Sequence, residues 1–247
     1  MKIAIALPMY SDAPALAAVS WIGLDRALTA AGHDVAWKVR IGDGIIQRAR
    51  NRVCGAIATG LGDLDELDVV LWLDADTVVA EPEAVQRMLE TLHTTDGIEF
   101  VAAASRLKRP GMQFSASPIL PLQPHDEHDR LIEVTGVGAS CMAWSGQLFQ
   151  HLVGEAAWFK TDEGDAPRIW REGLAELVDD DGEPIPGYCR IKGEDLTLCD
   201  DLRGMGITLW CDMAVPLGHV GAFNFAGTFA DFREQLEAMS DASQGPG

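Results

Sequence analysis

The first 105 residues alternate between strand-like and helix-like patterns, and this alternation constrains the fold more than any other feature of the chain. Apolar runs of strand length lie at residues 3–7, 34–39, 67–73 and 99–104. Helical patterns lie between them at residues 14–31, 45–58 and 82–93; the first ends at Gly32, and Pro82 opens the third. Repeated units of this kind predict an α/β fold with a mostly parallel, doubly wound sheet.

The second half of the chain is less regular. Residues 105–131 are rich in proline and glycine and predict a loop, and a β-rich stretch at 131–144 precedes a short helix near 147–152. The acidic residues 160–188 predict a long functional loop or lid. A helix is expected at 194–203 and a strand at 207–211. We therefore expect an irregular half to follow a regular one.

The formal net charge of −19 limits the possible partners. An acidic surface repels nucleic acid at long range, which argues against a general DNA-binding protein. It also favours solubility, and that is the simpler explanation of the charge.

Cysteine usage and hydropathy bear on the compartment. The five cysteines have no C-x-x-C spacing, so we expect reduced thiols rather than disulfides or a zinc site. No apolar run reaches the roughly 18 residues that would span a bilayer. The apolar start, residues 1–8, is too short for a signal peptide and predicts a core strand. A cytoplasmic protein is expected.

Two aspartates, Asp74 and Asp76, come directly after the strand pattern of residues 67–73. Open α/β sheets bind ligands at the carboxyl ends of their strands. Carboxylates there suit Mn²⁺ or Mg²⁺, and these cations suit a diphosphate. Alternation along an extended backbone places both carboxylates on one side, with Ala75 leaving room between them. The pair predicts a metal-assisted nucleotide site; the alternative is a polar strand end that caps the next helix.

Two further motifs carry candidate chemistry. Glu194 and Asp195 open a helical pattern, where the helix dipole favours an ionised carboxylate that can accept a proton. Acids in a first turn also stabilise helices without any other role, so both interpretations stay open. His219 lies between Gly218 and Gly221, which allow close approach of a ligand, and imidazole could be a third metal ligand. The alternative is an ordinary polar histidine.

A helical segment and a run of small residues complete the candidates. Arg50 could bridge a phosphate, and the amides of Gln47 and Asn51 could read a base edge. A solvated helix face would explain these residues equally well. Gly138 lies within the small residues 136–141, which suit either a bulky ligand or tight sheet packing.

The order of these motifs resembles that of family 2-like glycosyltransferases of the GT-A fold, in their bacterial and phage forms. The segments that carry the resemblance are residues 7–10, 49–52, 71–76, 136–142, 193–199 and 218–221. The resemblance implies one catalytic domain over residues 1–238. Its nucleotide-binding half would be 1–105 and its acceptor half 106–238, with a disordered tail at 239–247.

The resemblance also implies roles for single residues. Asp74 and Asp76 would face the metal and the donor, and His219 would complete the metal site. Asp195, with Glu194 beside it, would match the catalytic base. The residues expected around the nucleotide and its sugar are Pro8, Met9, Tyr10, Gln47, Arg50, Asn51, Ala75 and Gly138.

The implied reaction moves a sugar from a nucleoside-diphosphate sugar, UDP-sugar being favoured, to an acceptor hydroxyl with Mn²⁺ or Mg²⁺. Asp195 as base implies inversion at the anomeric carbon, while a retaining outcome stays open. The acceptor stays open, and a glycan, a protein or a small molecule would be the default. A hydroxylated DNA base is the alternative, supported locally by Arg106, Lys108 and Arg109 and opposed by the net charge.

Two other functions would also use an α/β fold that binds nucleotides. A nucleotidyltransferase would carry a glycine-rich basic loop after the first strand, where this chain has residues 9–14 without one. A non-catalytic nucleotide-sugar-binding module would need no base, so Asp195 and His219 together count against it.

Overall fold

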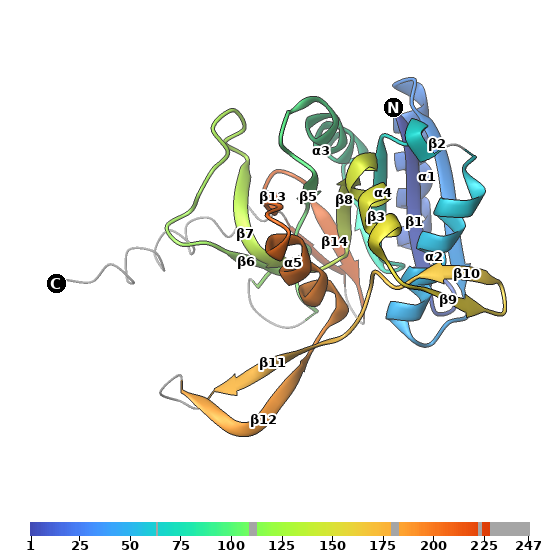
Figure 1. Ribbon diagram of the computed structural model, residues 1–247. Coiled ribbons are helices and arrows are strands. Elements are labelled where there is room, and N and C mark those ends of the chain that lie inside the picture. Colours follow the sequence, from blue (N-terminus) through green and yellow to red (C-terminus); the bar gives the residue numbers. More distant parts are fainter. Residues whose placement is uncertain (63, 109–112, 179–182, 222–223, 228–247) are drawn as a thin grey trace.

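The computed structural model describes residues 1–247 apart from 63, 109–112, 179–182, 222–223 and 228–247 (Figure 1). Its centre is an eight-stranded sheet in the order β2-β1-β3-β8-β5-β13-β7-β6. These strands are β1 (Lys2–Met9), β2 (Asp34–Ile41), β3 (Val69–Leu73), β5 (Phe100–Ala102), β6 (Ala116–Pro118), β7 (Leu131–Val137), β8 (Cys141–Ser145) and β13 (Trp210–Asp212). The strand pairings give six strands one direction and reverse only β7 and β8.

The predicted fold class, an α/β protein with a mostly parallel central sheet, is confirmed. The helices are α1 (Ala15–Ala30), α2 (Ile46–Gly60), α3 (Pro82–Thr94), α4 (Gly146–Glu155) and α5 (Glu194–Gly204), with a 3₁₀ turn at Leu64–Glu66. Pro82 does open α3, as the fixed φ of proline at a first helical position allows.

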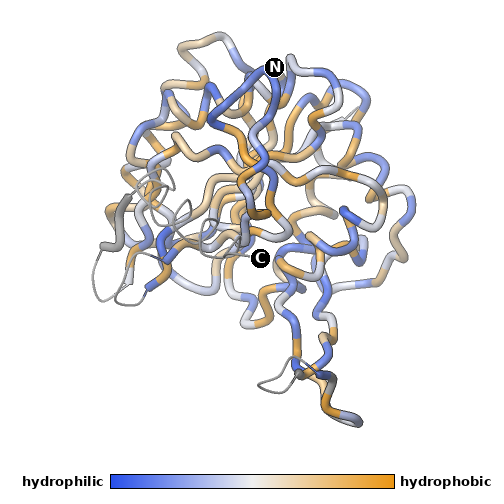
Figure 2. The backbone as a smooth tube through the Cα atoms, turned by 90° about the vertical axis from the view of Figure 1, so that its left-hand side faces the viewer, coloured by the Kyte–Doolittle hydropathy of each residue, from blue (hydrophilic) through white to orange (hydrophobic). Residues whose placement is uncertain are grey.

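Helices cover both faces of the sheet and define two apolar cores. Side chains of α1 and α3 pack on one face, and side chains of α2, α4 and α5 pack on the other. Successive residues of β3 alternate between these cores: Leu71 and Leu73 face α1 and α3, whereas Trp72 faces the opposite side. All five residues of β3 are buried, which accounts for its unbroken apolar sequence. Figure 2 shows hydrophobic residues along the central strands.

Smaller sheets extend this core. A three-stranded sheet joins β4 (Thr77–Val79), β14 (Leu217–Val220) and β15 (Asn224–Gly227). The remaining strands form two antiparallel hairpins: β9 (Trp158–Thr161) with β10 (Gly164–Pro167), and β11 (Gly173–Val178) with β12 (Pro184–Lys192). The β11–β12 hairpin projects from the body of the molecule (Figure 1).

Local structure differs from the expectation in two places. The described residues of 160–188 lie mostly in these two hairpins rather than in one long loop, because cross-strand pairing satisfies the backbone hydrogen bonds of this acidic, proline-containing segment. His219, which follows the last expected strand at 207–211, lies within a further strand, β14. The predicted tail at 239–247 and the boundary at 238 lie outside the described residues.

Among the described residues, no helix combines the length and the apolar character needed to cross a bilayer.

Candidate functional site

A cavity of about 480 Å³ opens at the carboxyl ends of β1 and β3. This is the edge at which open α/β sheets place their ligands. The β1 end contributes Pro8 and Tyr10, the start of α5 contributes Glu194 and Asp195, and β14 contributes His219. The full lining is Pro8, Tyr10, Ser11, Asp12, Pro14, Ile46, Arg50, Asp74, Ala75, Asp76, Glu194, Asp195 and His219.

Arg50 is the buried cation of this cavity. Its side chain is only 4% exposed, and its Nη2 lies 2.7 Å from Oδ1 of Asp74 while Nη1 lies 3.1 Å from Oε1 of Glu194. The guanidinium also lies 4.5 Å from the ring centre of Trp170, within the range of a cation–π contact. Arg50 therefore joins the end of β3 to the start of α5.

Asp76 is held by two basic side chains. Its Oδ1 lies 3.3 Å from Nε2 of His219, and its other carboxylate oxygen pairs with the ammonium of Lys108. The strands position the histidine: β14 runs antiparallel to β4 with His219 opposite Thr77, next to Asp76. Nδ1 of His219 lies 3.1 Å from the carbonyl oxygen of Arg106, which orients the ring.

The two aspartates differ in the direction in which their pKa values are shifted. Burial raises the pKa of Asp74, and the charge of Arg50 opposes that rise. For Asp76 burial acts in the same direction, but hydrogen bonds from His219 and Lys108 outweigh it and lower the pKa to about 2. Asp76 is therefore ionised at neutral pH.

Glu194 and Asp195 are adjacent but have different surroundings. Glu194 is committed to Arg50, whereas Asp195 forms no salt bridge within the described part of the chain. Its Oδ1 accepts a hydrogen bond from the backbone N–H of Leu196. A Cβ placed on Gly138 would lie 3.0 Å from Cβ of Ser115 and 3.6 Å from Oδ2 of Asp195, so this glycine packs closely against Ser115 beside the carboxylate. Of the two, Asp195 is therefore the candidate base.

Four residues predicted to contact the donor do not line the cavity: Met9, Gln47, Asn51 and Gly138. Met9 packs in the core beneath α1, because alternation along β1 turns it away from Pro8 and Tyr10. Gln47 and Asn51 share a helical face that is rotated from the cavity-facing side of α2. Asn51 uses its amide on the backbone of residues 169–170, with hydrogen bonds of 2.8 and 2.9 Å. Its role in this structure is to hold that segment.

Two contributors to the site went unrecognised in the sequence. Trp170 has no local signal, since it lies in an irregular segment between two hairpins. Lys108 stood out only as part of a basic cluster, and its contact with Asp76 joins residues 32 positions apart. Arg109 of that cluster lies outside the described residues.

The residues fit a divalent cation in part. A carboxylate and an oriented imidazole face each other at Asp76 and His219, a donor set that suits Mn²⁺. Asp74 is held by Arg50 instead. In the described ranges no group of three or more histidine, cysteine or acidic side chains is arranged to hold a metal. The three-ligand set expected from the sequence is thus not preassembled.

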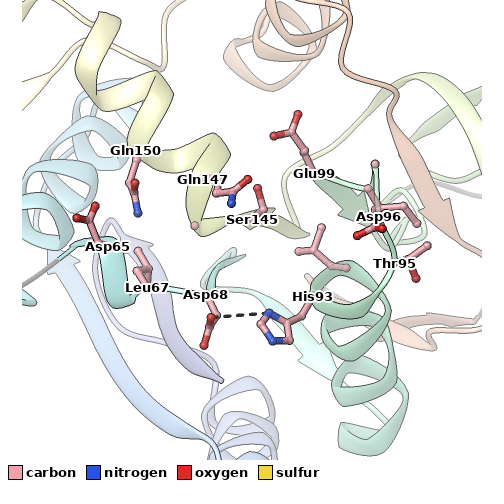
Figure 3. A pocket seen from close by; sticks show the side chains of 14 residues that line it. Asp65, Leu67, Asp68, His93, Thr95, Asp96, Glu99, Ser145, Gln147 and Gln150 are labelled. Carbon is pink, nitrogen blue, oxygen red and sulfur yellow. Dashed lines mark ion pairs between the residues drawn. The ribbon is translucent and has the colours of Figure 1, made fainter.

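A second hollow of about 320 Å³ lies at the opposite edge of the sheet (Figure 3). Its acidic side chains are Asp65, Asp68, Asp96 and Glu99, and His93 lies 3.8 Å from Asp68. None of the described residues that line it is lysine or arginine. This charge disfavours a diphosphate there, so the cavity at the carboxyl edge is the better candidate for a nucleotide.

No protein-family model matches the chain, and no curated protein matches it. Solved structures similar to it include a glycosyltransferase involved in glycosylation of the major capsid of PBCV-1, with a TM-score of 0.36, 10% identity and coverage of 61% of this chain. The match spans 63% of that glycosyltransferase chain.

Two other solved structures align over nearly the whole chain. A Bacillus anthracis protein described as a glucose-1-phosphate thymidylyltransferase has a TM-score of 0.42 at 10% identity, covering 97% of this chain and 95% of its own. A CMP:2-keto-3-deoxy-manno-octonic acid synthetase complexed with CTP has a TM-score of 0.40 at 15% identity, covering 98% and 100%.

Proposed function

We propose that this protein transfers a sugar from a nucleoside-diphosphate sugar to an acceptor hydroxyl. The observation that carries the proposal is the meeting, in one cavity, of a carboxylate free of salt bridges among the described residues with an Asp–His pair that suits a cation. That carboxylate is Asp195, and the pair is Asp76 and His219. The cavity volume of about 480 Å³ falls within the usual range for small-ligand sites.

Basic and aromatic groups of the cavity support a nucleoside diphosphate as the donor portion. Arg50 has a buried Nε without a hydrogen-bond partner in the described structure. Lys108, which pairs with Asp76, is a second positive charge next to the cavity. Such charges are suited to phosphate oxygens. Tyr10 is 73% exposed beside the cavity and offers a ring face to a base.

In the proposed reaction Asp195 accepts the proton of the acceptor hydroxyl. The acceptor oxygen forms a bond to the anomeric carbon as the bond from that carbon to the β-phosphate oxygen breaks. The electron pair of the broken bond leaves with the nucleoside diphosphate, and the configuration at the anomeric carbon inverts. Asp76 and His219 would hold Mn²⁺ or Mg²⁺, which would neutralise charge on the leaving diphosphate.

The test is a panel of UDP-, GDP- and other nucleotide sugars incubated with Mn²⁺ and candidate acceptor hydroxyl compounds. We expect release of nucleoside diphosphate from at least one donor, with Asp76→Asn inactive but still folded. The exposed Asp96→Asn is the matched control and should retain activity.

Other outcomes would overturn the proposal in distinguishable ways. Release of pyrophosphate from a nucleoside triphosphate and a sugar phosphate would identify a nucleotidyltransferase. A shift in melting temperature with no product from any donor would identify a binding module. Full activity of Asp76→Asn would remove the assigned cation site.

A further inference from the structure

We propose that Lys108 is an exchangeable counter-ion of the donor site. In the resting protein it neutralises Asp76, and it moves to the diphosphate when a divalent cation binds that carboxylate. This inference rests on the proposed function, because it requires a diphosphate beside Asp76. It adds a positioning role for a residue outside the expected metal and base set.

The contacts of Asp76 are the first observation. One oxygen faces Nε2 of His219 at 3.3 Å, and the other pairs with the ammonium of Lys108. A metal cation bound between Asp76 and His219 would therefore lie close to the ammonium group of Lys108, which already pairs with Asp76. Two positive charges at one carboxylate repel each other, so Lys108 has to leave before a divalent cation binds firmly.

Lys108 and Arg50 differ in their freedom to move. Arg50 is 4% exposed and held by Asp74, by Glu194 and by the ring of Trp170. The Lys108 side chain is 35% exposed, and its salt bridge to Asp76 is the single one it makes within the described residues. A flexible four-carbon stem with a point charge can change partners at little cost. Lys108 is the cation of this site that can exchange.

The surroundings of Lys108 permit this exchange without backbone movement. Its Cδ lies 3.2 Å from where a Cβ on Gly221 would be. Because Gly221 has no side chain, there is space beside it for the aliphatic part of the Lys108 side chain. The backbone nearby is anchored by the contact of the Arg106 carbonyl with His219, at 3.1 Å. A further hydrogen bond joins the Leu107 N–H to the carbonyl of Gln113 at 2.8 Å. Only the side chain needs to move.

The experiment measures two affinities of the full chain. Electron paramagnetic resonance of free Mn²⁺ gives the Kd for Mn²⁺ alone, and calorimetry gives the Kd for UDP at saturating Mn²⁺. For Lys108→Met we expect Mn²⁺ to bind about fivefold more tightly, as loss of a partly exposed ion pair would allow. We expect UDP to bind about tenfold more weakly, because a charge-assisted contact is lost.

Matched variants separate this role from a structural one. Lys108→Arg keeps the charge and should shift both affinities less than Lys108→Met. Lys2→Met removes a lysine that pairs with Glu66 away from the cavity and should change neither affinity. Weaker binding of both ligands to Lys108→Met would indicate a structural role and overturn the inference. Unchanged Mn²⁺ affinity, or no Mn²⁺ binding by any variant, would overturn it as well.

The outcome for Lys108 can be told apart from that for the proposed function. Nucleoside-diphosphate release by the wild type with unchanged Mn²⁺ affinity in Lys108→Met removes only the counter-ion role. Opposite shifts in the two affinities with no turnover of any donor remove the transferase and leave the counter-ion role standing.

Discussion

Glu194 and Asp195 show how neighbours in sequence acquire different chemistry from their partners. Both stand in the first turn of α5. Glu194 is 15% exposed and forms a salt bridge with Arg50, so its charge is already paired within the fold. Asp195 faces the cavity without such a cation among the described residues. The base role proposed for Asp195 follows from this difference.

For Asp195→Asn we expect kcat to fall by about 10²- to 10⁴-fold, the usual contribution of a general base. The Kd for UDP should stay unchanged, because the amide keeps the size of the side chain and the base does not contact the diphosphate. Steady-state kinetics on an active donor and UDP calorimetry measure the two values. If UDP affinity collapsed instead, Asp195 would be a binding residue.

At the scale of elements, α2 shows that a helical pattern predicts where a helix lies but not which of its faces meets a ligand. Residues 45–58 were expected to be helical, and α2 spans Ile46–Gly60. The pattern did not say which face meets the ligand. Ile46 and Arg50, one turn apart, line the cavity, whereas Asn51 faces residues 169–170. A local pattern leaves that rotation undetermined, because packing partners elsewhere in the chain set it.

The start of α2 depends on Asp43. Ile45 supplies no side-chain cap, and Oδ1 of Asp43 instead accepts a hydrogen bond from the Ile45 N–H at 3.0 Å. A hydrogen bond from Arg48, aided by the Ile45 N–H and Arg52, lowers the pKa of Asp43 from 3.8 to about 2, although burial opposes the shift. The ionised carboxylate therefore stabilises this helix end.

A stability prediction with a defined pH dependence follows for Asp43. Because its folded pKa is depressed, its contribution is complete above pH 3.8 and is lost as the pH falls through about 2. At pH 7 we expect Asp43→Asn to lower the free energy of unfolding by about 1–2 kcal/mol. Urea unfolding at pH 7 and near pH 2 measures this, with exposed Asp96→Asn as control. A difference from wild type that persisted unchanged at pH 2 would contradict the assignment.

For the molecule as a whole, three tryptophans connect the core to the candidate site. Trp72 lies on β3, Trp144 on β8, and Trp170 between β10 and β11. Their ring centres are 4.9 to 5.4 Å apart, and each is at most 1% exposed. Trp170 also contacts the guanidinium of Arg50. The ring that fills the core thus also supports the buried cation of the cavity.

Removal of Trp170 should affect stability and site together. For Trp170→Ala we expect a loss of about 3–5 kcal/mol in the free energy of unfolding, as for other large-to-small core changes. Trp158→Ala is the matched control, because Trp158 is 44% exposed on β9 and should cost far less. Urea unfolding followed by circular dichroism compares them. Equal losses in the two variants would show that the cluster is not the packing centre described here.

The elements and their order were readable from the chain because they depend on local periodicity. The buried strand that ends at Leu73, just before Asp74, and the helices on either side of it follow from residues close in sequence. The two hairpins at 158–192 were missed, since an acidic, proline-containing sequence hides cross-strand pairing.

The sequence pointed to several residues that line the cavity, among them Asp74, Asp76 and His219, but not to their partners. Arg50 with Asp74, and Lys108 with Asp76, join positions 24 and 32 apart, and Trp170 reaches α2 across a still longer separation. Such contacts depend on how β3, α2, α5 and β14 pack, which no short window of sequence encodes. In the sequence alone, the carboxylates of Asp74 and Asp76 look equivalent. Packing made them unequal, because Arg50 reaches the first, and His219 and Lys108 reach the second.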